Sequence, residues 1–348
     1  MHFGIFMEEM RRGASHGEAI RDALDLADAA EGLGLHGVWL GELHFLPARS
    51  ALPAVWPIVA AIAARTRRIR IGTAVCVLPL AHPLRTAEEV ATVDHISEGR
   101  FEFGVGRSGA ARTYDQLEVP YAESQARFLE ALAIIREAWK GQPFTFRGEF
   151  YRMDNVSVSP LPYQRPHPPI RMAATTPETF VHVAQMGLPI FVGLRGTDIA
   201  ELALHIQGYR TAWQEAGHAG DGDVYLRIPL YAAETDQAAT DEPRETILYY
   251  FKRQADLTRN WSPRGAAATV AERAQTAEKL ASLSYEHILT QKVAFGSPAS
   301  LVDRLGHLAK ELGLNGFVFE LNPGGMLSNE QVLRSARVVA REVMPALL

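Results

Sequence analysis

The sequence predicts a (β/α)₈ TIM barrel, a fold of the α/β class, with insertions and with residues 1–348 in a single domain. About eight short apolar segments rich in β-branched residues alternate with segments of helical periodicity. Glycine and polar residues gather where the expected strands end, which is where barrel enzymes build their sites. A chain of 348 residues is long enough for one large α/β domain.

Turn residues separate strands from helices in the first half of the chain. Pro79 bounds the β-branched run at 69–77, and Pro83 suits the first turn of the helix that follows. Gly99 lies just past the end of that helix, where glycine commonly terminates helices. Strands are therefore expected at 2–7, 37–40, 69–77 and 101–105, and helices at 17–33, 51–66, 83–98 and 123–140.

The second half of the chain repeats the alternation and adds two excursions. Thr176 precedes Pro177, which is a capping residue followed by proline at the first helical position. Ser328 and Gln331 have the spacing of a capping box that starts the last helix. The segment 260–294 reads as a long loop over the active site, with a helix inside it. Further strands are expected at 170–174, 189–192, 224–231 and 316–321, helices at 198–216, 243–259, 298–312 and 328–344, and a hairpin at 144–158.

The composition is that of an ordinary globular protein, with 47% hydrophobic and 22% charged residues. The net charge of -5 gives no reason to expect nucleic acid or an anionic membrane as a partner. The single cysteine, Cys76, cannot form an intrachain disulfide, so the reducing cytoplasm is the expected location. The sequence has no metal-ligand spacing, and we expect neither a metal site, a signal peptide nor a membrane span.

A doubly wound dinucleotide-binding sheet is the main alternative fold. Residues 104–109 spell G-x-G-x-x-G directly after an expected strand. The dinucleotide fingerprint requires a helix that opens at these glycines. Tyr114, Asp115 and Pro120 come before the next expected helix, so the barrel is the preferred interpretation.

Candidate phosphate-binding residues follow two of the expected strands. Arg107 lies beside glycines that include Gly109, where a guanidinium could bind a phosphate bidentately or pair with a surface carboxylate. Thr175, Thr176 and Thr179 lie at an expected helix N-terminus, which favours an anion. Capping by Thr176 would explain part of this pattern equally well.

His44 lies with Glu42 in a short polar loop after the second expected strand. Histidine can act as a general base near neutral pH, but a structural role is the common alternative for a single histidine. Cys76 lies inside an apolar strand, and nothing near it in the sequence would lower a thiol pKa, so we expect it to pack in the core.

Several motifs along the chain are specific when taken together: Val38-Trp39-Leu40-Gly41-Glu42-Leu43-His44-Phe45, Gly72-Thr73-Ala74-Val75, Val77-Leu78-Pro79, Ala81-His82-Pro83, Asp94 to Gly106, Gly187-Leu188-Pro189 and Val343-Met344-Pro345. They resemble the bacterial luciferase family of flavin-dependent monooxygenases, and in particular its light-emitting alkanal monooxygenases. The resemblance covers essentially the whole chain and is weakest over 260–294. It implies a (β/α)₈ barrel that binds reduced FMN, supplied by a separate flavin reductase, and reacts with molecular oxygen.

The resemblance also implies roles for individual residues. Arg107 and Gly109, with Thr175, Thr176 and Thr179, would hold the FMN phosphate. Ala74-Val75 matches a family site where a cis peptide lies against the isoalloxazine ring. His44 matches a family histidine needed to form or use the flavin C4a-peroxide, which oxidises a small organic substrate such as an aldehyde, a ketone or a secondary metabolite.

Some positions depart from the light-emitting pattern. Gly106 replaces a reactive cysteine, Thr175-Thr176 replaces Glu-Ser, and the tryptophans of the luciferase substrate pocket are not matched. These differences weaken the expectation of light emission and of a long-chain aldehyde substrate. Two alternative functions stay open: a deazaflavin-dependent oxidoreductase of the same superfamily, which transfers hydride without oxygen, and a non-catalytic partner subunit.

Two expectations concern motion and assembly. The segment 260–294 is expected to be a mobile lid that shields the flavin from water. Residues 51–64 carry no charge and are apolar on every face of the expected helix. We therefore expect this helix, with the one that follows it, to form a homodimer interface that includes Ile58 and Ile62.

Overall fold

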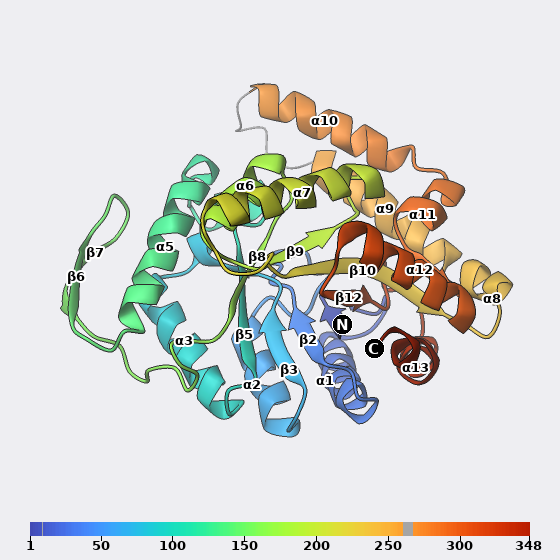
Figure 1. Ribbon diagram of the computed structural model, residues 1–348, viewed down its shortest axis with the longest axis horizontal. Helices are drawn as coiled ribbons and strands as arrows, with labels where there is room; N and C mark the ends of the chain where they lie inside the picture. Colours follow the sequence, from blue (N-terminus) through green and yellow to red (C-terminus); the bar gives the residue numbers. More distant parts are fainter. Residues whose placement is uncertain (9, 260–266) are drawn as a thin grey trace.

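Eight parallel strands form a closed barrel in the computed structural model, which describes residues 1–8, 10–259 and 267–348 (Figure 1). Every barrel strand has two neighbours, because β12 pairs with both β1 and β10, and β10 also pairs with β9. A doubly wound sheet would leave two edge strands, so that alternative is wrong. The strands, in order around the barrel, are β1 (His2–Met7), β2 (Gly37–Leu40), β3 (Arg70–Thr73), β5 (Phe101–Gly106), β8 (Ile170–Ala173), β9 (Ile190–Gly193), β10 (Val224–Ala232) and β12 (Gly316–Glu320).

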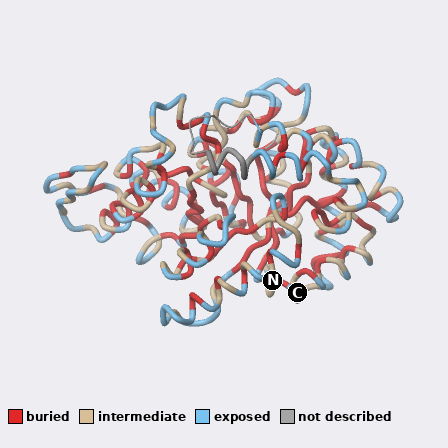
Figure 2. The backbone as a smooth tube through the Cα atoms, turned by 90° about the horizontal axis from the view of Figure 1, so that it is seen from above, coloured by how far each residue is buried: buried red, intermediate tan, exposed pale blue. Residues whose placement is uncertain are grey.

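Helices surround the barrel and bury their apolar faces against it, so the buried residues concentrate toward the centre (Figure 2). Capping boxes at Ser15 and Ser328 start the first and last of these helices, and Ser328 was expected from its spacing to Gln331. The helices are α1 (His16–Gly32), α2 (Val55–Arg65), α3 (Pro83–Ile96), α5 (Ser124–Ala138), α6 (Pro177–Gln185), α7 (Ile199–Glu215), α9 (Arg244–Arg259), α12 (Pro298–Leu312) and α13 (Asn329–Val338).

Short elements interrupt the alternation. The expected hairpin is present as the antiparallel pair β6 (Phe144–Arg147) and β7 (Arg152–Val156), which extends away from the barrel (Figure 1). Strand β11 (Ala294–Gly296) pairs in parallel with the C-terminal end of β10, and β4 (Cys76–Val77) pairs with β5. The remaining pieces are η1 (Leu78–Leu80), α4 (Ala111–Gln116), η2 (Tyr121–Glu123), α8 (Asp236–Asp241), η3 (Val339–Val343) and α14 (Met344–Leu347).

The described part of the segment 260–294 is mostly helical and contains two helices, which corrects the expectation of a long loop with one helix inside it. Residues 260–266 lie outside the described residues, and the chain continues as α10 (Ala267–Ala281) and α11 (Tyr285–Gln291). Leu280 and Ile288 join Phe251 of α9 in a small apolar core of their own. The sequence did not predict this packing, because a run of alanines does not separate an apolar helix face from a polar one.

Helix α2 is shorter than expected and is largely covered by its own chain. It begins at Val55, not residue 51. Ile58 is 9% exposed and Ile62 fully buried within the single chain. These two residues therefore belong to the core, and their assignment to a dimer interface is wrong. The exposed side of α2 carries the small residues Pro57, Ala61 and Ala64, and Arg65 at its C-terminal end.

Aromatic side chains fill the barrel interior below the strand ends. Phe6, Trp39, Phe191 and Tyr225 pack together with Val318. The Trp39 ring occupies the space that a Cβ atom at position 72 would need, which explains the glycine in β3. Because the interior is packed, a ligand must bind above it, at the mouth of the barrel. None of the described helices is long and apolar enough to cross a membrane.

Candidate active site

The predicted site residues follow strands whose C-terminal ends lie at the same mouth of the barrel. Arg107 follows β5, and Thr175 comes two residues after β8. These strands pair in parallel, with Val105 opposite Met172, so Arg107 and Thr175 leave neighbouring strands. His44 follows β2, and Ala74 follows the adjacent β3.

Arg107 is half-buried and has no carboxylate partner among the described residues. Its guanidinium donates to the Ser124 hydroxyl at 3.4 Å, and its backbone carbonyl accepts the Tyr114 hydroxyl. The alternative of a surface ion pair is therefore not observed. Gly109, also half-buried, accepts the Ala111 N–H at 3.1 Å where α4 begins.

The threonines at the start of α6 present hydroxyl groups that do not cap the helix. Thr176 occupies the N-cap position, but its side chain makes no capping hydrogen bond. Its hydroxyl instead lies 3.0 Å from that of Thr179, and Thr175 is exposed beside them. A guanidinium, several hydroxyls and a helix N-terminus together make a donor set that fits a phosphate group.

The segment after β3 lies close against β5. The Ala74–Val75 peptide bond is cis, as the resemblance implies, and it divides the single strand expected at 69–77 into β3 and β4. A Cβ atom at Gly106 would lie 2.5 Å from a Val75 methyl carbon. The glycine at 106 thus leaves the room that Val75 occupies.

His44 is held by Glu42. Their Nε2 and Oε1 atoms are 2.6 Å apart, and the two side chains are 24% and 12% exposed. The second carboxylate oxygen accepts the Val77 N–H at 2.8 Å. Cys76 is buried as expected, and burial, together with the neighbouring Glu42 carboxylate, raises the pKa of its thiol.

A buried charge cluster at the mouth was not expected from the sequence. Arg227 binds Glu320 through two hydrogen bonds of 2.8 and 2.9 Å, and its guanidinium lies 3.4 Å from the centre of the Phe6 ring. Glu8 pairs with Arg49 nearby. Burial alone would raise the pKa of Glu8, but neighbouring arginines hold it below its ordinary value. The sequence did contain a signal for this cluster, because Arg227 and Glu320 are charged residues within the otherwise apolar strands β10 and β12.

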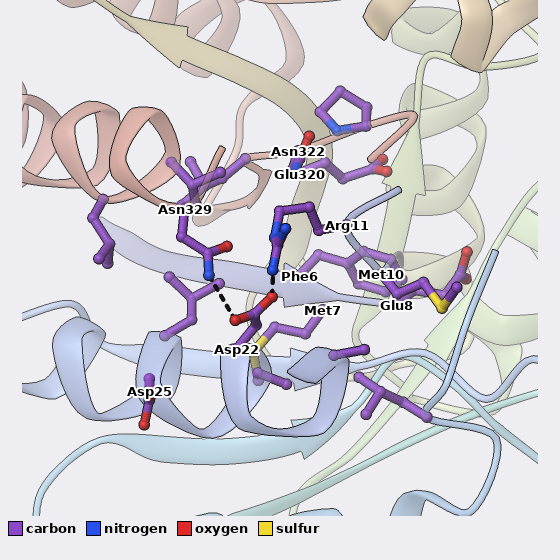
Figure 3. Close-up of a pocket in the computed structure, with 18 residues that line it drawn as sticks. Phe6, Met7, Glu8, Met10, Arg11, Asp22, Asp25, Glu320, Asn322 and Asn329 are labelled. Carbon is purple, nitrogen blue, oxygen red and sulfur yellow. Dashed lines mark hydrogen bonds and ion pairs between the residues drawn. The ribbon is translucent and has the colours of Figure 1, made fainter. Parts of the chain in front are cut away.

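A cavity of about 180 Å³ lies between α1, α13 and the ends of β1 and β12. Asp22 accepts hydrogen bonds from Arg11 at 3.3 Å and from Asn329 at 2.6 Å beside it (Figure 3). Glu8 and Glu320 also line the cavity. Around the barrel, β1 and β12 lie opposite β5 and β8, so this cavity and the candidate phosphate site occupy opposite sides. No cluster that could hold a metal ion occurs among the described residues.

A closed parallel barrel with guanidinium, hydroxyl and imidazole groups at its C-terminal mouth has the arrangement of barrel enzymes, which bind their ligands at the strand ends. The chain belongs to the luciferase-like monooxygenase family, whose model matches residues 1–316. Its relatives are named monooxygenases and dehydrogenases, and the chain is an oxidoreductase of this family.

Three relatives and one solved structure show the range of similar proteins. The oxygenase component of the flavin-dependent trigonelline monooxygenase of Acinetobacter baylyi is 25% identical, over 99% of this chain and 95% of that protein. The F420-dependent glucose-6-phosphate dehydrogenase of Amycolatopsis mediterranei is 28% identical, over 87% and 89%. The uncharacterized protein y4wF of Sinorhizobium fredii is 36% identical, but the match spans only 51% of this chain and 52% of that protein.

The structural comparison confirms the fold. The oxygenating constituent of 3,6-diketocamphane monooxygenase from Pseudomonas putida, a type II Baeyer-Villiger monooxygenase solved in complex with FMN, matches with a TM-score of 0.85. The match covers 100% of this chain and 99% of that one at 20% identity.

Proposed function

We propose that the protein is a two-component flavin monooxygenase, which uses reduced FMN and molecular oxygen to oxidise a small organic substrate. The observation that carries the proposal is the gathering of the phosphate donor set, the Ala74–Val75 segment and His44 at one mouth of the barrel. When bound, reduced FMN supplies the electrons that activate oxygen. The relatives named monooxygenases, one of them an oxygenase component, support both the reaction class and a separate flavin reductase as partner.

In this proposal each residue has a distinct task. Arg107 binds the FMN phosphate through its guanidinium, which forms no ion pair with a carboxylate among the described residues. Gly109 and the hydroxyls of Thr175, Thr176 and Thr179 complete the phosphate site. Ala74 and Val75 lie beside the flavin ring, and His44 accepts or returns a proton during the oxygen step.

Anaerobic mixing with reduced FMN, followed by a pulse of oxygen, tests the proposal. The expected result is saturable binding of reduced FMN and then a transient absorbance of a flavin C4a-peroxide. A candidate organic substrate is identified when it accelerates the decay of that absorbance. Oxidation of reduced FMN at the rate of the free flavin, with no transient, would reject the proposed reaction.

A deazaflavin-dependent oxidoreductase is the second candidate function, because the Amycolatopsis relative is named for F420. Such an enzyme transfers a hydride and has no need of oxygen. Parallel titrations with reduced FMN and with reduced F420 distinguish the two. We expect FMN to bind more tightly, and a clear preference for F420 would favour the second function.

A further inference from the structure

The Glu42 carboxylate joins two parts of the candidate site that are distant in the sequence. Its Oε1 atom lies 2.6 Å from His44 Nε2, and its Oε2 atom accepts the Val77 N–H at 2.8 Å. Glu42 follows β2, whereas Val77 belongs to β4, directly after the Ala74–Val75 peptide. One side chain therefore fixes the position of the histidine relative to the backbone proposed to lie beside the flavin ring.

The chemistry of the pair determines the direction of the hydrogen bond. An ionised carboxylate has no proton to donate, so His44 Nε2 must carry the hydrogen. The Cys76 thiol also contacts this carboxylate, and burial, followed by Glu42 itself, raises the pKa of Cys76. A protonated thiol donates, so the groups around Glu42 all supply hydrogens to it.

The other ring nitrogen of His44 is then the reactive one. A neutral imidazole with its hydrogen on Nε2 carries its lone pair on Nδ1. Within the described part of the chain, Nδ1 has no hydrogen-bond partner, and the side chain is 24% exposed. This atom is open to a ligand or to water at the mouth of the barrel.

We propose that Glu42 is a positioning residue that holds His44 in the Nε2–H tautomer, so that Nδ1 takes a proton from the site and returns it. The catalytic part of this inference rests on the proposed function. The tautomer itself does not, because it follows from the contact between the two side chains. A purely structural Glu42 would support the Val77 N–H and have no effect on the histidine.

Nitrogen-15 NMR of the full-length protein tests the tautomer directly. The signals of His44 are assigned by their loss in His44→Ala. In the wild type we expect Nε2 to have the shift of a protonated nitrogen and Nδ1 that of an unprotonated one at a pH where the ring is neutral. A predominant Nδ1–H form in the wild type would overturn the proposal without any further variant.

Glu42→Gln tests the link to catalysis. An amide accepts through its oxygen and donates through its nitrogen. If the amide oxygen keeps the Val77 bond, the amide NH2 faces His44 Nε2 and favours the Nδ1–H tautomer instead. We expect the His44 signals to shift toward the Nδ1–H tautomer and turnover to be lower by about 10–100-fold, the range found for partners that orient metal-binding histidines. The affinity for reduced FMN should stay unchanged. Glu215→Gln, at an exposed position on α7, is the matched control for removal of a charge.

A double variant distinguishes positioning from an independent role. If Glu42 acts through His44, Glu42→Gln adds nothing to the loss in His44→Ala. The proposal is contradicted if the two substitutions lower turnover multiplicatively in the double variant. It is also contradicted if the His44 tautomer is unchanged in Glu42→Gln. Full turnover in His44→Ala would instead reject the role of His44 in the proposed function, while the NMR result would still decide the tautomer.

Discussion

Arg107 tests the candidate phosphate site at the scale of a single residue. Its guanidinium contacts only the Ser124 hydroxyl, at the long distance of 3.4 Å, among the described residues. We expect Arg107→Ala to weaken reduced-FMN binding by about 1–3 kcal/mol, the range for hydrogen bonds to charged groups. Anaerobic titration measures the affinity. Arg112 is an exposed neighbour on α4, and Arg112→Ala is the control. Equal affinities of the two variants for reduced FMN would mean that Arg107 does not bind the phosphate.

His44 tests the chemistry separately from binding. We expect His44→Ala to fold and bind reduced FMN as the wild type does, with turnover lower by about 10²–10⁴-fold, which is typical for loss of a general acid–base group. Steady-state substrate oxidation and flavin titration measure the two effects. His16→Ala removes an exposed histidine at the start of α1 and should change neither. Wild-type turnover in His44→Ala would make the histidine structural.

At the scale of elements, Gly106 sets the distance between β5 and the segment after β3. An added methyl at 106 would meet Val75, so we expect Gly106→Ala to lower the free energy of unfolding by about 1–3 kcal/mol. Val75→Ala in the same chain should restore most of the loss by making room. Urea denaturation measures both. Gly208→Ala is the control, because position 208 on α7 has open space, and a similar loss there would exclude a specific clash.

Glu31 joins α1 to the start of β3 and makes the fold sensitive to acid. Its carboxylate accepts the backbone N–H groups of Arg67, Arg68 and Ile69 at 2.7–3.1 Å. Burial opposes ionisation, but these three hydrogen bonds lower the pKa of Glu31 to about 2. A carboxyl group whose pKa is lowered on folding stabilises the fold above its unfolded pKa, and this stabilisation is lost as the pH falls through the folded value.

The stabilisation by Glu31 should therefore decline between about pH 4.5 and pH 2. We expect the melting temperature of Glu31→Gln to depend less on pH across this window than that of the wild type. Thermal unfolding followed by circular dichroism at several pH values measures the difference. Glu215→Gln should retain the wild-type dependence, and parallel curves for Glu31→Gln would contradict the assignment.

At the scale of the whole molecule, the exposed face of α2 is the proposed interface of a homodimer. Pro57, Ala61 and Ala64 keep the middle of this face small, with Arg65 at its C-terminal end, so the same helix of a second chain could approach closely across a two-fold axis. We expect sedimentation to show a dimer at micromolar concentration and Ala61→Arg to shift it toward monomer. Ala216→Arg, at an exposed position after α7, should leave the dimer intact. A wild-type monomer would reject the interface.

The sequence by itself determined the alternation that makes the barrel and the places where its elements end. Strand and helix periods, the proline in the first turn of α3 and the capping box at Ser328 depend on neighbouring residues, so they could be recognised without any tertiary contact. The candidate residues Arg107, Thr175 and His44 could be located because each lies within a few residues of a strand end, in a fold whose ligands bind at strand ends.

The tertiary structure alone decided which of these residues touch and which apolar residues are covered. Glu42 and Val77 are 35 positions apart, and Arg227 and Glu320 are 93 apart, so only the strand register brings them together. The same holds for Ile62, whose burial depends on what packs against α2 rather than on its own helix. Local sequence sets backbone preference over a few residues, whereas burial and ion pairing depend on contacts between distant segments.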